Sequence, residues 1–156
     1  MRTTWNRWKF HLSALVLGAS VFYGPGYVSG AHWAHMGERV LAPVAVGPFE
    51  VTLAEEVVDP PRRDPYGEIL KDYTVILSAA GAKAVKAAWL HVGAPEAGRE
   101  TGEMLGGNPY RLHGHVHFPE TYGPDDTLWL TVETWGGDIH TASWSLGEAL
   151  GVLARR

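Results

Sequence analysis

The chain has 156 residues, enough for one domain and a short additional segment. Residues 1–9 hold three of its 13 basic residues and no acidic one, so the remaining chain carries 17 acidic against 10 basic residues. This acidic body argues against a nucleic-acid partner, and the absence of cysteine excludes disulfides, thiolate zinc sites, iron–sulfur clusters and blue copper centres.

The first 30 residues start basic, become apolar from Phe10 to Tyr23, and then reach a Gly-Pro-Gly turn. A cleaved signal peptide has this order of charge and hydrophobicity. A retained membrane anchor needs about 20 mostly apolar residues with aromatic residues at both interfaces. Residues 8–27 meet that description, with tryptophan at one end and tyrosine at the other. We therefore expect a transmembrane helix or a signal peptide over residues 10–30, and the aromatic ends favour the anchor.

The basic residues at the start also predict an orientation. Positive charge stays on the cytoplasmic side of a membrane, so residues 1–9 are expected in the cytoplasm. The rest of the chain then lies in the periplasm, attached to a bacterial inner membrane by a single pass. We expect a juxtamembrane linker over residues 31–43, a β-sandwich over 44–146, and a short helical or frayed tail over 147–156.

The body of the chain shows short runs of alternating apolar and polar residues separated by turn residues, a pattern typical of half-buried strands. No long helical period occurs after Glu38, and a proline-rich loop is expected over residues 59–68. About six or seven such strands predict an all-β fold, an antiparallel β-sandwich of two sheets. The runs that predict strands are 49–53, 73–77, 85–92, 110–118, 128–135 and 142–146.

The last two strands can be registered from their side chains. A two-residue loop places Trp144 opposite Trp129 and mixes apolar with polar positions. A three-residue loop over residues 136–138 instead segregates them, and such loops with a glycine in the left-handed region are common. We therefore expect the three-residue loop, with His140 opposite Thr134. The expected partners of Leu128, Leu130 and Val132 are Leu146, Trp144 and Ala142.

Residues 71–146 resemble the FixH/YtkA-like family of exported immunoglobulin-like domains. The resemblance rests on "DYTVILSA", on "GGNPYRLHGHVHFP" and on the ending "LWLTVETWGGDIHTASWSL". It implies an immunoglobulin-like sandwich that follows one amino-terminal membrane helix. It also implies an association with copper-linked oxidase maturation, although these motifs determine the fold more than the function.

Three histidines, His113, His115 and His117, occupy every second position of one predicted strand and therefore share its face. Neighbouring imidazoles at this spacing can bind one copper or zinc ion, with a further ligand from another strand or loop. An exposed strand face must also be polar, and histidines satisfy that need without a metal. Both interpretations remain open.

A second group of candidate ligands follows the apolar segment. His32 and His35 fall on one face if this segment is helical, and Met36 adds a thioether that suits copper. The alternative is a polar cluster at the membrane interface, with Trp33 as an anchor.

Four tryptophans lie in the predicted strands. Trp89 and Trp144 are expected in the core, whereas Trp129 and Trp135 fall on the outward face and would mark a site for a protein partner. An integral membrane protein is the partner expected for such an anchored domain.

Motifs of enzyme chemistry are missing: the sequence contains no G-x-S-x-G, no phosphate-binding loop and no H-E-x-x-H. We therefore expect a non-enzymatic accessory protein of a metal-handling or respiratory membrane system, with copper or zinc as the candidate ions. The alternative is a structural or assembly subunit that binds no metal and docks through its tryptophans and its helix.

Overall fold

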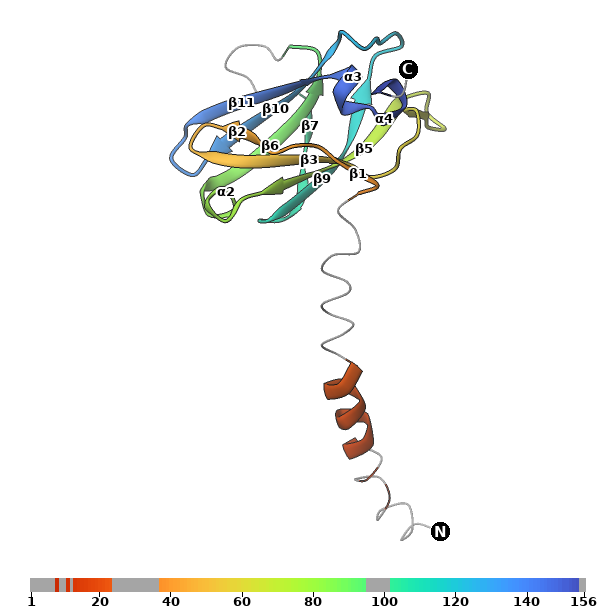
Figure 1. The fold of residues 1–156 in the computed structure, drawn as a ribbon, viewed down its shortest axis with the longest axis vertical. Coiled ribbons are helices and arrows are strands. Elements are labelled where there is room, and N and C mark those ends of the chain that lie inside the picture. Colours follow the sequence, from red (N-terminus) through yellow and green to blue (C-terminus); the bar gives the residue numbers. More distant parts are fainter. Residues whose placement is uncertain (1–7, 9–10, 12, 24–36, 95–101, 155–156) are drawn as a thin grey trace. The chain divides into compact units, whose positions relative to one another are not determined.

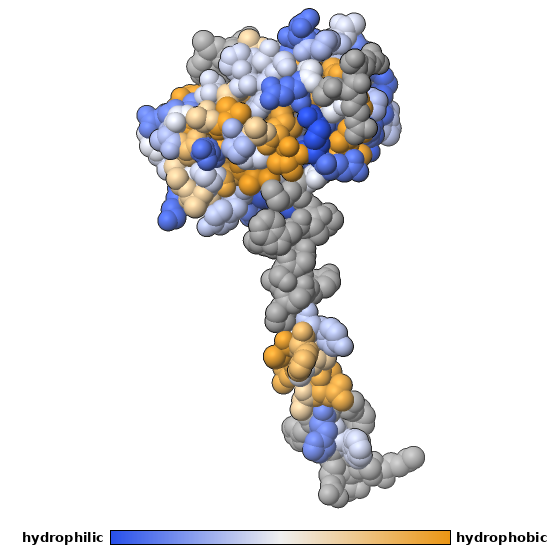
Figure 2. Space-filling view, in the orientation of Figure 1, coloured by the Kyte–Doolittle hydropathy of each residue, from blue (hydrophilic) through white to orange (hydrophobic). Residues whose placement is uncertain are grey.

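The computed structural model describes Trp8, His11 and residues 13–23, 37–94 and 102–154. The chain divides into two compact units, Met1–His35 and Met36–Arg156. The first contains a helix over residues 13–23. Its apolar side chains are exposed around the helix, among them Leu15, Val21 and Phe22 (Figure 2). Within the described segments, none of the helices combines the length and the apolar character needed to cross a membrane.

The second unit is built from two antiparallel sheets (Figure 1). In the described residues, the larger sheet has the order β1-β3-β5-β9-β8, with β2 also paired to β3 and β4 paired to β5. The smaller sheet has the order β11-β10-β6-β7. The larger sheet comprises β1 (Arg39–Val40), β2 (Val44–Val46), β3 (Phe49–Glu55), β4 (Arg62–Arg63), β5 (Ile69–Leu77), β8 (Gly106–Asn108) and β9 (Arg111–Phe118). The smaller comprises β6 (Val85–Val92), β7 (Glu103–Met104), β10 (Thr127–Thr134) and β11 (Ile139–Ser145).

The core lies between the sheets and is filled by alternate residues of each strand, as the period of two requires. Burying each of these side chains contributes about 1.5–3 kcal/mol relative to leaving it in water. The all-β prediction, with two packed antiparallel sheets, is thereby confirmed. The fully buried apolar residues from both sheets include Val51, Leu53, Tyr73, Val75, Leu90, Val116, Leu128, Leu130 and Val132.

The register predicted for the last hairpin is wrong by two residues. Leu128 lies opposite Trp144, Leu130 opposite Ala142, and Val132 opposite His140. The three-residue loop is 135–137 rather than 136–138, because the N–H of Thr134 donates to the carbonyl of Asp138 over 2.9 Å. Gly137, with φ of 88°, then takes the third loop position, which requires the left-handed region.

A shift of two residues keeps every side chain on its predicted face, since strand side chains alternate with a period of two. The inward set was therefore correct although the partners were not. The shift does move His140, which faces inward opposite Val132 instead of beside Thr134. Its ring packs edge-on against Phe49 of the other sheet, with centroids 5.9 Å apart.

The boundaries of the sandwich lie outside the predicted limits at both ends. β1 belongs to the sheet although it falls in the expected linker over residues 31–43. At the other end α3 (Leu146–Ala149) and α4 (Gly151–Ala154) fold back, and Leu146, Ala149 and Leu150 are fully buried in the core. Residues 147–154 of the predicted tail over 147–156 are therefore part of the fold. A further short helix, α2 (Ala79–Ala84), joins β5 to β6.

If the tail closes the core, truncating Leu150 must weaken the whole domain. We expect Leu150→Ala to lower the free energy of unfolding by about 2–5 kcal/mol, through lost burial and a residual cavity. Urea denaturation followed by tryptophan fluorescence measures this change. Tyr66→Ala, at an exposed turn, is the control and should change the value by less than about 0.5 kcal/mol. Equal small effects for the two variants would show that the tail is not part of the core.

Candidate functional site

The three histidines of β9 lie on the outer surface of the larger sheet. His113, His115 and His117 are exposed, whereas Val116 and Phe118 between and beyond them are buried. This arrangement is the one expected from strict alternation in a strand with one face in the core. These three solvent-facing imidazoles follow one strand, and we call them the histidine row.

The neighbouring strand β5 supplies the residues beside this row. Thr74 lies opposite His113, Asp72 opposite His115, and Leu70 opposite His117. Nδ1 of His115 contacts Oδ1 of Asp72 directly. Nδ1 of His117 makes a longer contact of 3.4 Å with Oε2 of Glu68, just before β5. Two of the three imidazoles are therefore paired with a carboxylate.

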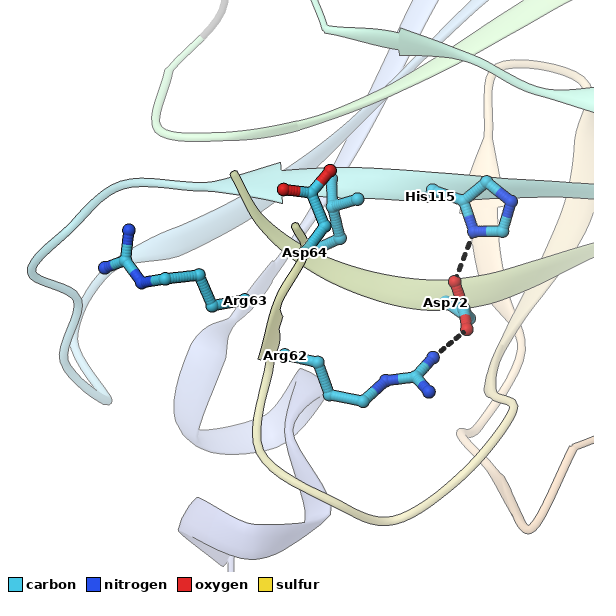
Figure 3. A pocket seen from close by; sticks show the side chains of 6 residues that line it. Arg62, Arg63, Asp64, Asp72 and His115 are labelled. Atoms are coloured by element: carbon cyan, nitrogen blue, oxygen red, sulfur yellow. Dashed lines mark hydrogen bonds and ion pairs between the residues drawn. The ribbon is translucent and has the colours of Figure 1, made fainter. Parts of the chain in front are cut away.

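Asp72 has two partners, one at each carboxylate oxygen. Its second oxygen, Oδ2, accepts a hydrogen bond of 2.8 Å from Nη2 of Arg62 on β4, so the carboxylate joins Arg62 to His115 (Figure 3). These side chains line an open hollow of about 260 Å³, whose other walls are Arg63, Asp64 and Leu70. Arg62 and His115 thus fix the Asp72 carboxylate from two sides.

Arg63 points away from Asp72 (Figure 3) and forms an ion pair with Glu120. Its guanidinium donates two hydrogen bonds to Glu120, of 3.1 and 2.6 Å. The hydrogen bond and the charge of Arg63 hold the pKa of Glu120 below its ordinary value, and Glu120 raises the pKa of Arg63 in turn. Both side chains are largely exposed to solvent, so the pair contributes little to stability.

The chemistry of the row follows from the carboxylates. An ionised carboxylate only accepts hydrogen bonds, so Nδ1 of His115 must carry the proton that it shares with Asp72. When the ring is neutral, Nε2 is then left with a lone pair, the form in which imidazole binds a metal. Metal-binding histidines commonly donate their other nitrogen to a carboxylate in this way. Across the described part of the chain, however, no three His, Asp or Glu side chains are grouped closely enough to hold an ion by themselves.

A comparison with models of protein families shows which family the chain belongs to. The model of the family described as uncharacterised conserved protein UCP029505 matches residues 4–147. The chain belongs to this family. The matched range includes the N-terminal helix and every strand of both sheets, so both units belong to the sequence that the family shares. No curated protein and no solved structure matches the chain.

The two tryptophans among the predicted site residues lie apart from the histidine row. His32, His35 and Met36 lie outside the described residues. Trp129 is half-buried on the outer face of the smaller sheet, and Trp135 is 72% exposed at the tip of the β10–β11 hairpin. The two tryptophans are about 20 Å apart if β10 is extended between them, too far to form one patch.

A buried polar cluster at the end of the sandwich was not predicted. Glu55 and Lys71, both on strands of the larger sheet, are 0% and 3% exposed. Oε1 of Glu55 lies 3.1 Å from Nζ of Lys71, and Oε2 accepts a hydrogen bond of 3.0 Å from Nε of Arg39. The sequence did contain a signal for this cluster. Glu55 is at the next alternate position after Phe49, Val51 and Leu53, whose side chains were expected to point inward. Lys71 lies two positions before Tyr73, which begins the inward-pointing residues of the next strand. Charged residues at alternate positions that otherwise hold buried apolar residues indicate a buried ion pair.

The ion pair between Arg63 and Glu120 predicts a pH dependence. The pKa of Glu120 is lower in the folded chain than in the unfolded one. The pair therefore stabilises the fold at a pH above the unfolded pKa of Glu120, and this stabilisation is lost as the pH falls through the folded pKa. In Arg63→Gln, we expect the pKa of Glu120 to rise to its ordinary value, as measured by carboxyl carbon NMR. Arg62→Gln, which leaves the pair intact, should not move it. An unchanged titration of Glu120 in Arg63→Gln would show that the pair does not form in solution.

Proposed function

We propose that the chain is a non-enzymatic accessory protein of a metal-handling or respiratory membrane system and binds copper or zinc through the histidine row. The observation that carries this proposal is the pairing of Nδ1 with a carboxylate at both His115 and His117. When the ring is neutral, each pairing leaves the Nε2 lone pair available, because a hydrogen bond from one ring nitrogen selects the tautomer of the other. Imidazole ligands suit copper, zinc and nickel.

The geometry favours an exchangeable ion over a permanent structural one. Alternate residues of a strand are about 6.8 Å apart at Cα, so two neighbouring imidazoles can converge on one ion while three rarely can. A structural zinc site has four protein ligands, whereas this row offers two or three on an exposed face. The remaining positions would be taken by water or by a ligand from a partner. Such a site is suited to passing an ion on.

We also propose that the domain is exported and anchored in the bacterial inner membrane, with the lipid bilayer around residues 8–27. The exposed apolar side chains of the helix over residues 13–23 and the basic residues before it support this location. The partner would then be an integral membrane protein. His32, His35 and Met36 remain candidate ligands next to the membrane.

The strand order supports an immunoglobulin-like fold for this domain. With β3, β5 and β9 in the positions of strands A, B and E, and β6, β10 and β11 in those of C, F and G, both sheets follow the immunoglobulin order. This agreement supports the proposed FixH/YtkA-like relationship, and with it an accessory role beside a respiratory complex.

The second candidate is a structural or assembly subunit that binds no metal. It is favoured by the exposure of Trp135, together with Ile139 on the same hairpin. A large exposed tryptophan at the end of a rigid hairpin is a common anchor in protein interfaces. This candidate needs the hairpin tip, and it does not need the histidine row.

Calorimetric titration of the full chain with Cu²⁺ and Zn²⁺ separates the two candidates. We expect micromolar or tighter binding of at least one ion, with an affinity on the order of 100-fold lower or absent in the double variant His115→Ala, His117→Ala. His91→Ala, on the other sheet, is the matched control and should bind as the wild type does. If the wild type gives no binding heat with either ion, only the structural candidate remains.

The carboxylate partners should tune the same site. Asp72→Asn keeps the shape of the side chain but removes the charge that orients His115. We expect it to weaken metal binding about 10-fold, the lower end of what such changes cost in metal sites. Asp64→Asn, in the same hollow but without a histidine contact, is the control. Equal affinity in Asp72→Asn and the wild type would show that His115 binds without help from Asp72.

A further inference from the structure

The buried end of the sandwich brings an amine and two carboxylates together. Nζ of Lys71 lies 2.7 Å from Oδ1 of Asp59 and 3.1 Å from Oε1 of Glu55. Lys71 and Glu55 are buried, while the side chain of Asp59 is 36% exposed in the loop that follows β3. We call these three residues the lysine cluster.

The position of Lys71 is unusual for this residue type, because buried lysines generally keep their charged end in water. Here the amine is turned into the protein, where it donates to the carbonyl of Asp59 over 2.6 Å and to the carbonyl of Val57. Burial, with a smaller effect of Glu55, also raises the pKa of the adjacent Tyr73 phenol. The amine and Glu55 therefore have little access to water, whereas Asp59 reaches the surface.

Glu55 has one occupied and one available oxygen. Oε2 accepts hydrogen bonds from Nε of Arg39 and from the N–H of Gly151. Oε1 is buried without a hydrogen-bond partner among the described residues, although it lies beside the amine. A buried carboxylate oxygen with no donor is costly, and it is positioned to accept a proton from Lys71.

We propose that Lys71 and Asp59 form an intramolecular isopeptide bond, with Glu55 as the proton carrier. Oε1 of Glu55 takes a proton from Nζ, and the neutral amine attacks Cγ of Asp59. A new Nζ–Cγ bond forms, one Cγ–O bond breaks, and the oxygen leaves as water with the two protons that Nζ has lost. Glu55 is ionised again at the end, and no oxidant or cofactor is consumed.

Burial favours the product over the reactants. An ion pair loses the solvation of two charges inside a protein, whereas the amide is neutral and loses much less. The one N–H that remains on Nζ still has the carbonyl of Val57 or Asp59 as acceptor. The bond would tie the loop after β3 to β5 in a chain that has no cysteine for a disulfide.

The residue after Asp59 limits the competing reaction. Aspartate also loses water when the next backbone nitrogen attacks its side chain to give a succinimide. Pro60 has no backbone N–H, so that route is closed at this position. Loss of water that depends on Asp59 therefore indicates attack by Lys71.

Mass spectrometry of the denatured full chain tests the proposal. We expect a mass lower than that of the unlinked chain by one water, and a tryptic digest in which residues 40–62 are joined to residues 64–83. Recovery of residues 40–62, 64–71 and 72–83 only as separate linear peptides from folded wild-type protein would overturn the inference, because trypsin cleaves after an unmodified Lys71.

Variants identify the reacting groups. Asp59→Ala, at a partly exposed loop position, and Lys71→Arg should both have the full mass, and Glu55→Gln should slow or stop the loss of water. Asp64→Ala is the control and should keep the deficit. A deficit that persists in Lys71→Arg would assign the lost water to another reaction and also overturn the proposal. The wild-type digest decides the question even if a variant fails to fold.

Discussion

The antiparallel pairing of β5 with β9 is the constraint on which the rest of this structure depends. Its register runs from Ile69 opposite Phe118 to Ile76 opposite Arg111, and it determines both faces of the larger sheet at once. On the inner face it brings Tyr73, Val75 and Val116 into the core. On the outer face it sets Asp72 beside His115. A slip of one residue would exchange the two faces, so the core and the candidate site are specified together.

The same alternation produces a conflict at one end of the sandwich. It carries Glu55 and Lys71 inward, where an unpaired charge would be strongly destabilising. Three parts of the chain supply partners for these two charges. Arg39 and the N–H of Gly151, the latter over 2.9 Å, donate to Glu55. The loop after β3 accepts a hydrogen bond from Lys71. A Cβ at Gly151 would lie 2.7 Å from Val58 and 2.9 Å from Glu55, so this close approach requires glycine. The C-terminal segment therefore both fills the core and closes a polar cluster.

Much of the fold could be predicted from alternation, because a strand with one buried face reveals that face in its sequence. This holds for the histidine row and for the inner face of the last hairpin. The register of that hairpin could not be read off, since Gly136, Gly137 and Asp138 allow several loops and only the backbone bonds of Thr134 select one. The pairs of His115 with Asp72 and His117 with Glu68 depend on which strands are neighbours, and alternation within one strand carries no information on that.

The most direct test of the central claim is the tautomer of the histidines, measured by nitrogen–proton correlation NMR on the metal-free protein above the pH at which imidazoles are protonated. If β5 and β9 pair as described, carboxylates accept from Nδ1 of His115 and His117, and both rings should be in the Nδ1–H form with Nε2 unprotonated. Rings found mainly in the Nε2–H form would contradict the register, and with it the candidate site.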